Sequence, residues 1–344
     1  MAEYISFQPS DFFNTKMYTG TAAELAVTGV GFQPDMVWLK DPDYAYNHII
    51  TDAVRGATKN IYPNGSYAED TDAQGVKSFD ADGFTVGTTA SYNKSGDDFV
   101  SWNWKAGTTS GISGGTVTPT AYSFNTTAGI SILKYTGNNT SGATIAHGLG
   151  AVPEFILVKN LSTGSTPWRA YHVGLGPDYS ITLNESDGKA DNSTFWNDTA
   201  PTSTLITMGN DSKINGTDDY IMYIFASKKG YSRFGGYTGN GADDGGFIYT
   251  GFRPAYFLIK RTTDAADWRV WDNRRDAYNQ MDKTLSPNNE NITASGTSYY
   301  MDFLSNGIKF RQGLTGNASA KEYIYAAFAE FPLVSSNDVP GVAR

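Results

Sequence analysis

The chain has no cysteine and only three histidines among its 344 residues. The missing cysteines exclude disulfides, zinc–thiolate sites and thiol chemistry, although they fix no cellular compartment. No apolar run reaches the roughly 18 residues of a membrane span, and no basic segment precedes an apolar one near the start. We therefore expect neither membrane insertion nor a signal peptide.

Basic residues are outnumbered: the chain has 26 Lys and Arg against 35 Asp and Glu, which gives a formal net charge of −9. The sequence pI is about 4.8. Because an acidic surface repels phosphate backbones, nucleic acid is not an expected partner.

Glycine and aromatic residues are abundant, with 37 Gly, 22 Tyr, 19 Phe and 7 Trp. This mixture favours short β-strands joined by tight turns over helices. The length allows two or three domains, each large enough to bury a core of its own.

One stretch occurs three times. Each copy starts with Gly, has Pro at its fourth position, continues with mostly apolar residues and carries Lys at its tenth position. The copies span residues 31–41, 150–160 and 251–261. Such a short apolar run, preceded by a proline that ends earlier structure, predicts a buried β-strand. The prolines Pro34, Pro153 and Pro254 lie 119 and 101 residues apart, so each copy marks a unit of domain size.

Other signatures recur in the same order around these copies. A Tyr-Thr-Gly segment opens each unit, at 17–20, 134–137 and 236–239. An aromatic strand closes each unit, at 99–105, 220–226 and 323–329. Asp-Gly or Asn-Gly pairs at 82–83, 215–216 and 306–307 predict hairpins.

The repeats predict an all-β chain of three tandem β-sandwich modules, jelly-roll or lectin-like, of about 100 residues each. The expected boundaries are an N-terminal arm at 1–16, module one at 17–106, a Gly/Ser/Thr-rich linker at 107–129, module two at 130–230, module three at 231–332 and a C-terminal arm at 333–344. Residues 1–16 fit either an arm that docks on a neighbour or an ordinary first strand and loop. Since no spacer separates modules two and three, we expect these two to pack tightly.

The strand segments 155–158 and 256–259 are apolar without alternation. A strand that is apolar on both sides should be covered on both sides, by another module or by another subunit. This pattern favours a homo-oligomer, and a trimer is the favoured state.

Candidate chemical groups are few. Gly111-Ile-Ser-Gly-Gly115 matches the G-x-S-x-G nucleophile motif, but it lies in the expected linker, without the strand and helix that a nucleophile elbow needs. His48, His147 and His172 have no metal-binding spacing, and His147 is expected to bond backbone in a turn.

Three further groups have an alternative structural interpretation. Asp243-Asp244 could ligate Ca²⁺, but the pair lacks the pattern of an EF-hand and reads better as a solvated turn. Trp168 and Trp268 could stack on sugars, yet their equivalent places in two units indicate core residues first. We therefore assign no catalytic, cofactor-binding or metal residues, expect no cofactor, and leave glycan-binding residues unassigned.

The repeats together resemble a family of bacteriophage virion proteins, tail or appendage proteins of unknown function that are common in marine phages. The motifs that carry the resemblance lie at 7–16, 51–56, 98–107, 134–150, 237–241, 250–254 and 342–344. The resemblance implies a structural protein of the particle with lectin-like β modules, and it carries over no catalytic residues.

We accordingly expect a non-enzymatic structural protein of a tailed-phage virion. Its role would be that of a tail appendage or fibre-type component that contacts other virion proteins and a host-surface glycan. One alternative is a capsid decoration protein without receptor binding. The other is a tailspike-like enzyme that depolymerises glycans, since paired catalytic carboxylates are recognised by distance and not by sequence.

Overall fold

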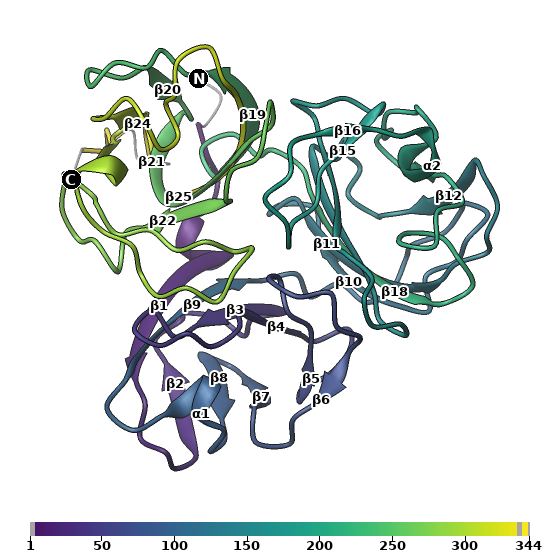
Figure 1. Cartoon of the computed structure of the whole chain (residues 1–344). Helices are drawn as coiled ribbons and strands as arrows, with labels where there is room; N and C mark the ends of the chain where they lie inside the picture. The colour runs from purple at the N-terminus through teal and green to yellow at the C-terminus, as the bar shows by residue number, and fades with distance from the viewer. Residues whose placement is uncertain (1–3, 336–338, 343–344) are drawn as a thin grey trace.

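A computed structural model describes residues 4–335 and 339–342 of the chain. The described chain is β-rich with only short helices, which confirms the expected all-β class, and it forms three lobes around a shared centre (Figure 1). Each lobe has one large antiparallel sheet and smaller sheets packed outside it. We call the lobes the first module (residues 13–104), the second module (121–225) and the third module (232–332).

The first module has a large sheet with strand order β1-β9-β3-β4 and small sheets β2-β8-β7 and β5-β6. The large sheet contains β1 (Phe13–Thr19), β9 (Asp98–Trp104), β3 (Met36–Lys40) and β4 (Ile49–Asp52). The remaining elements are β2 (Leu25–Thr28), β5 (Lys59–Asn60), β6 (Asp70–Thr71), β7 (Val76–Asp80), β8 (Gly83–Val86) and helix α1 (Ala90–Asn93).

The second module repeats this order as β11-β18-β13-β14 and adds β10 beside β11. Its large sheet contains β10 (Ala121–Asn125), β11 (Ile130–Thr136), β18 (Asp219–Phe225), β13 (Phe155–Asn160) and β14 (Arg169–His172). Outside it lie β12 (Ala143–Ala146), β15 (Tyr179–Ser180), β16 (Ala190–Asp191), β17 (Leu205–Met208) and helix α2 (Ser193–Trp196).

The third module has the order β19-β25-β21-β22 with a small sheet β20-β24-β23. Its strands are β19 (Ser232–Thr238), β20 (Phe247–Tyr249), β21 (Phe252–Arg261), β22 (Arg269–Asp272), β23 (Met301–Leu304), β24 (Gly307–Phe310) and β25 (Glu322–Pro332). The 3-10 helices η1 (Pro9–Asp11) and η2 (Thr297–Tyr299) complete the elements. In β21 the strand passes through Pro254 with register shifts on both sides of it, so this proline marks a bulge and not a strand start.

Two of the three expected hairpins are present. Gly83 pairs with Asp80, and Gly307 pairs with Leu304, so each turn has two residues between its strands. The Asn215-Gly216 turn is different, because it follows the bends after β17 instead of joining paired strands. In that place Asn215 is buried and its amide donates to the carbonyls of Thr140 and Gly209, at 3.0 and 2.8 Å.

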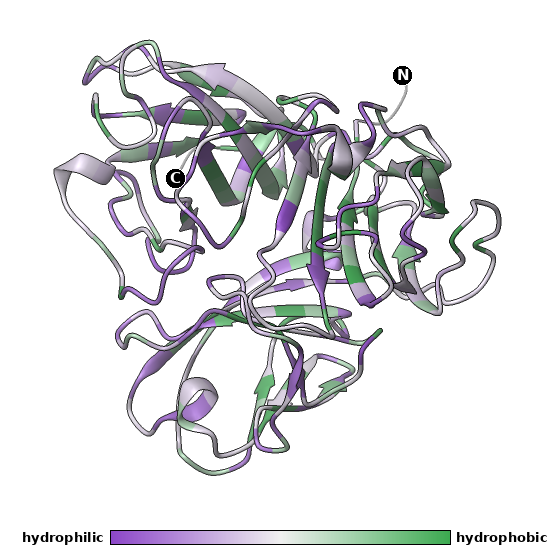
Figure 2. Cartoon of the chain, turned by 45° about the vertical axis from the view of Figure 1, so that its right-hand side comes forward, coloured by the Kyte–Doolittle hydropathy of each residue, from purple (hydrophilic) through white to green (hydrophobic). Residues whose placement is uncertain are grey.

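Each large sheet is apolar on both faces because each face has its own partner inside the chain. In β13, Ile156 and Val158 belong to the outer core of their module, while Phe155 and Leu157 face a core shared by all three modules. Alternate residues of a strand point to opposite faces, so a continuous apolar run is required here. Figure 2 shows hydrophobic residues concentrated on the strands, with hydrophilic residues frequent in the loops. The two apolar faces that favoured an oligomer are thus both covered within one chain, and they no longer argue for a second subunit.

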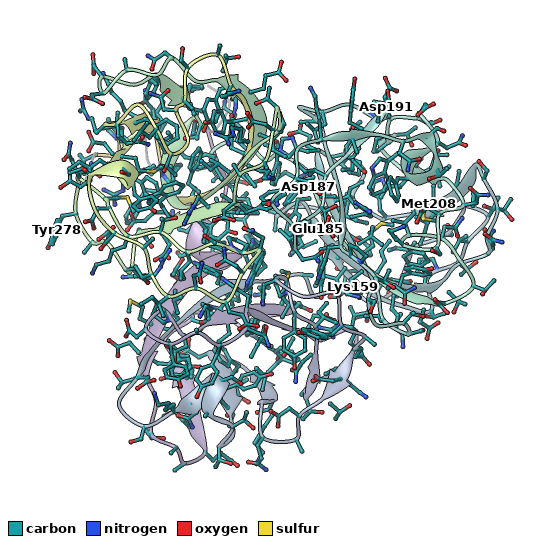
Figure 3. All side chains as sticks on the ribbon, in the orientation of Figure 1. Lys159, Glu185, Asp187, Asp191, Met208 and Tyr278 are labelled. Carbon is teal, nitrogen blue, oxygen red and sulfur yellow. The ribbon has the colours of Figure 1, made fainter. Side chains whose placement is uncertain are left out.

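At the centre of the shared core, three aromatic residues at equivalent positions of the modules pack together: Trp104, Phe225 and Phe328. Their ring centroids lie 6.3 Å apart for Trp104 and Phe225, 5.7 Å for Phe225 and Phe328, and 5.4 Å for Trp104 and Phe328. Figure 3 shows side chains filling the space between the lobes. The first module therefore packs as intimately as the other two.

Hydrogen bonds also link each module to the one before it. The indole N–H of Trp168 donates to the carbonyl of Tyr62, and that of Trp268 donates to the carbonyl of Thr182, both at 2.9 Å. The third module reaches the first through the N–H of Thr293, which donates to the carbonyl of Pro42 at 2.7 Å. The ring of contacts is closed.

The expected linker and arms need correction. Residues 107–129 include strand β10, which pairs with β11 along its whole length, so this segment is part of a sheet. The last residues of the 1–16 arm belong to β1, and Phe7 packs against Phe12 and Tyr231 of the chain itself, at 5.1 and 5.6 Å between ring centroids. The first-strand interpretation is therefore the better one.

The C-terminal segment folds back instead of extending. Ser335 donates to the carbonyl of Val339 at 2.9 Å, and Gly341 donates to the carbonyl of Leu333 at 2.7 Å. Arg253 reaches this segment through a 2.8 Å bond to the carbonyl of Val342. The rest of the predicted arm, residues 336–338 and 343–344, lies outside the described residues.

Candidate functional site

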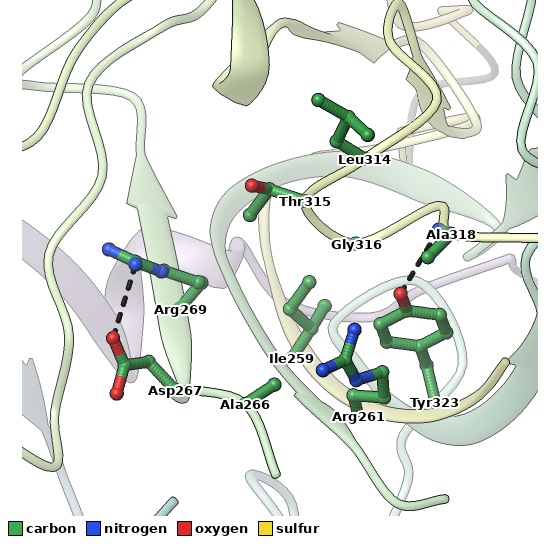
Figure 4. A pocket seen from close by; sticks show the side chains of 10 residues that line it. All are labelled: Ile259, Arg261, Ala266, Asp267, Arg269, Leu314, Thr315, Gly316, Ala318 and Tyr323. Atoms are coloured by element: carbon green, nitrogen blue, oxygen red, sulfur yellow. Dashed lines mark hydrogen bonds and ion pairs between the residues drawn. The ribbon is translucent and has the colours of Figure 1, made fainter. Parts of the chain in front are cut away.

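A groove of about 290 Å³ opens on the third module, between the loop after β21 and the loop before β25 (Figure 4). Its walls combine two arginines, an aspartate, a tyrosine and several small or apolar residues. The lining residues are Ile259, Arg261, Ala266, Asp267, Arg269, Leu314, Thr315, Gly316, Ala318 and Tyr323. The polar groups come from the ends of β21, β22 and β25, which the sheet holds in fixed positions.

The groove lies beside a backbone position that the three modules hold in the same way. In each module a tyrosine of the first large-sheet strand donates its hydroxyl to one backbone carbonyl. The three pairs are Tyr18 to Tyr92 at 2.7 Å, Tyr135 to Ile214 at 2.6 Å and Tyr237 to Gly316 at 2.7 Å. Tyr92 and Ile214 are buried at this position, whereas in the third module Phe310 and Ile259 occupy the space next to Gly316.

Gly316 is required by its surroundings. Its φ is +81°, and an added Cβ would lie 2.6 Å from Cε1 of Phe310 and 2.8 Å from Cδ1 of Ile259. Both the left-handed backbone and these approaches exclude a larger residue.

The charges of the groove are balanced. Arg269 forms an ion pair with Asp267 at 3.2 Å, and Arg261 pairs with Asp264 on the rim. Lys321 also reaches Asp264, at 2.7 Å, and its hydrogen bond lowers the pKa of that carboxyl. Such paired groups present N–H donors and carboxylate acceptors side by side, which suits a ligand with several hydroxyls better than a free ion.

Tyr323 adds a directed donor. Its hydroxyl accepts the N–H of Ala318 at 3.1 Å, and no acceptor for its own proton occurs among residues 4–335 and 339–342. The ring stacks on Tyr237 with centroids 5.0 Å apart, so the hydroxyl is held in place. The equivalent Tyr220 differs, because its hydroxyl proton goes to the carbonyl of Ser212 at 2.6 Å.

The structure places the candidates from the sequence apart from this groove. Ser113 lies exposed in irregular chain, with neither a strand nor a helix beside it, so the G-x-S-x-G match has no nucleophile-elbow geometry. Asp244 forms ion pairs with Lys309 at 2.6 Å and with Arg311 at 3.6 Å. The hydrogen bond from Lys309 lowers the pKa of Asp244, which fits a surface ion pair better than a Ca²⁺ ligand.

The three histidines are buried and far apart in the fold. The Nδ1 of His48 accepts the indole N–H of Trp38 at 3.1 Å, and His172 contacts the carbonyl of Tyr325 at 3.0 Å. His147 accepts the N–H of Leu149 at 3.3 Å, as expected for a turn. Burial lowers the pKa of all three rings, for His172 to about 4.

Trp168 and Trp268 are core residues, as their repetition indicated, and neither ring is exposed for stacking. The arginine that follows each of them differs between modules. Both arginines lie over an aromatic ring, Arg169 at 4.6 Å from the centroid of Phe195 and Arg269 at 5.2 Å from that of Tyr299, but Arg269 also forms the ion pair with Asp267 in the groove. This difference could not be predicted, since both modules contain the same Trp-Arg pair.

A family model described as "Domain of unknown function (DUF7483)" matches residues 8–332. The chain belongs to the DUF7483 family. The match spans all three modules of this DUF7483 chain, so the family unit is the whole ring and not one repeat. No curated protein and no solved structure is significantly similar to the chain.

Within residues 4–335 and 339–342 of the DUF7483 chain, no group of three or more His, Cys, Asp or Glu residues is arranged to hold a metal ion. In the same part of the chain, no helix has the length and apolar character needed to cross a membrane.

Proposed function

We propose that the chain is a non-catalytic structural protein of a tailed-phage virion, a tail appendage component that contacts a host-surface saccharide through the groove of the third module. The groove carries the saccharide part of this proposal. Paired Arg and Asp groups and the free proton of the Tyr323 hydroxyl offer both donors and acceptors to neutral hydroxyls. Pockets with a few convergent polar groups on rigid elements are the usual form of a small-ligand site.

The virion part rests on the resemblance of the sequence motifs to phage appendage proteins. A rigid ring of three fused modules is consistent with a scaffold that presents a surface. Other virion proteins are the proposed partners. Light scattering of the purified protein tests the homo-oligomer, with a trimer favoured, that the sequence pattern predicted before both faces of each large sheet were found covered within one chain.

Mass spectrometry of purified virions tests the location, and a labelled antibody in electron microscopy separates tail from head. We expect the protein in the particle and the label on the tail. A label on the capsid would favour the decoration alternative, and absence from virions would refute the proposal.

A glycan array combined with a reducing-end assay tests the contact. We expect binding of neutral saccharides without release of oligosaccharide, and loss of that binding in Arg269→Gln. Arg169→Gln is the matched control, because this arginine holds the equivalent place in the second module but lies over Phe195. Released oligosaccharide would favour the depolymerising enzyme. An equal loss of saccharide binding in both variants would argue against the groove as the binding site.

A further inference from the structure

A second and larger groove, of about 490 Å³, lies where the N-terminal segment meets the second and third modules. It shares no residue with the groove of Figure 4. Two cations, two tyrosines and one carboxylate face it. The lining residues are Tyr4, Glu154, Ser227, Lys229, Gly230, Ser232, Arg233, Phe234, Tyr249, Thr250 and Gly251.

This groove is open because the repeat is incomplete at this junction. Glu154 holds the place of Asp35 in the first module, since each donates its N–H to the closing strand at 2.8 Å, to Phe225 and Trp104 respectively. At the junction of modules one and two, Ser123 of strand β10 donates to the carboxylate of Asp35 at 2.8 Å and helps bury it. The large sheet of the third module ends at β19 without such an added strand.

The cations of the groove lack acidic partners. Among the residues that the structure describes, no carboxylate lies within ion-pair distance of Lys229 or Arg233, whereas Arg261 and Arg269 of the other groove are both paired. Two cations without a carboxylate partner at one groove, in a chain of net charge −9, attract an anionic group.

Aromatic rings stand beside these cations. Tyr249 is 46% exposed, and the guanidinium of Arg233 lies 5.5 Å from its ring centroid. The ammonium of Lys229 lies 4.5 Å from the ring centroid of Tyr4, whose hydroxyl donates to the carbonyl of Gly251. The hydrogen bond holds the Tyr4 ring, and each of the two rings lies next to a positive charge.

Glu154 supplies the acceptor side of the groove. Its carboxylate accepts the hydroxyl of Ser227, and it retains capacity for further hydroxyl donors. A bare anion would gain nothing from this carboxylate or from the rings. A ligand with hydroxyls, a flat ring face and a negative group would use all three.

We propose that this groove binds an acidic saccharide unit, with Arg233 and Lys229 on its negative group and Tyr249 against its ring. The negative group is a carboxylate or a phosphate. This site is separate from the neutral-saccharide groove of the third module, so either assignment can fail without the other.

Titration calorimetry of the whole chain with glucuronate, glucose 6-phosphate, glucose and inorganic phosphate tests the proposal. We expect one of the two acidic sugars to bind at least about tenfold more tightly than glucose, as an ionic hydrogen bond contributes about 1.5–3 kcal/mol. The better of the two sugars identifies the negative group. The preference should shrink as salt is raised, because salt screens exposed charges.

Variants assign the binding to this groove. Arg233→Gln should weaken the acidic sugar about tenfold or more, and Tyr249→Ala should weaken it as well. Arg169→Gln, at an arginine that lines neither groove, should leave it unchanged. The proposal is overturned by equal affinity for glucose and both acidic sugars, by no binding of either acidic sugar, or by full affinity in Arg233→Gln. Phosphate binding as tight as glucose 6-phosphate, with no effect of Tyr249→Ala, would reduce the site to an anion site and overturn the saccharide assignment.

Discussion

The third module differs from the first two at one equivalent position. Tyr92 and Ile214 are buried beneath the loop that precedes the closing strand, while Gly316 stands at this position in the third module and lines the groove. All three positions keep the same hydroxyl-to-carbonyl bond from a tyrosine of the first strand. The backbone of the repeat is thus maintained although the residue at this position differs among the modules.

The largest loss of stability is expected at Trp268, a buried residue that the second and third modules share. Trp268→Ala removes a buried ring and leaves the carbonyl of Thr182 without its donor, so the free energy of unfolding should fall by about 3–5 kcal/mol. Urea denaturation measures the change. Tyr278→Ala is the control, since this ring is 80% exposed at the periphery (Figure 3) and its loss should cost within about 0.5 kcal/mol. Similar losses of stability in both variants would contradict the role of the Trp268 hydrogen bond in joining the third module to the second.

The next largest loss of stability is expected when the side chain of Ile214, buried at the place equivalent to Gly316, is shortened. Ile214→Ala should lower the free energy of unfolding by about 2–4 kcal/mol, again by urea denaturation. Leu314→Ala is the comparison variant, because Leu314 is 66% exposed on the rim of the groove and should change stability little. If Ile214→Ala were as mild as Leu314→Ala, the side chain of Ile214 would not matter to the fold.

Three equivalent lysines predict a pH dependence. Burial lowers the pKa of Lys40, Lys159 and Lys260 to about 8 in the folded chain, from 10.5. Between these values the unfolded chain binds more protons, so stability should rise with pH from about 8 toward 10, by up to about 1.4 kcal/mol per pH unit for each lysine. Above that range the buried tyrosines, whose pKa values are raised by burial, reverse the trend as they ionise on unfolding.

Thermal melts at pH 7.5 and 9.5 check this slope. Lys159→Met should reduce it by roughly one third if the three sites are equivalent. Lys77→Met, at a partly exposed ion pair with Glu24, should not change it. A flat profile in the parent chain would show that the buried lysines hold ordinary pKa values.

The smallest expected effect is on ligand affinity in the groove of the third module. Tyr323→Phe removes the directed hydroxyl, and the affinity for a neutral saccharide should fall about fivefold, as expected for one hydrogen bond of about 1 kcal/mol. Calorimetry measures it. Phenylalanine already stands at the equivalent position as Phe99, so the fold should tolerate the change. Unchanged affinity would remove Tyr323 from the site.

Much of the fold follows from the sequence because it depends on local pattern. The repeated strand with Lys at its tenth position, the Tyr-Thr-Gly openings and two of the hairpins all correspond to observed elements. The closure of the ring could not be predicted, because a continuous apolar strand does not say whether a module or a subunit covers its second face. Strand β10 was missed since its Ala-Tyr-Ser-Phe-Asn sequence lies in a Gly/Ser/Thr-rich segment that resembles a linker.

The candidate site was beyond prediction for a different reason. The groove is lined by Gly316 and by Arg269, which forms an ion pair with Asp267. The Trp-Arg pair that two modules share does not reveal this ion pair. Lys40, Lys159 and Lys260 were found by their spacing, but their burial at the module junctions, for Lys159 beside the carbonyl of Ser66, comes only from the packed ring.

The meeting of Trp104, Phe225 and Phe328 at the centre also determines how the chain should melt. Modules strung as independent beads would each give a heat-absorption peak of their own. Here one face of each large sheet packs against the other modules, so loss of one lobe exposes the other two to water. A calorimeter should therefore record one cooperative endotherm for the entire chain.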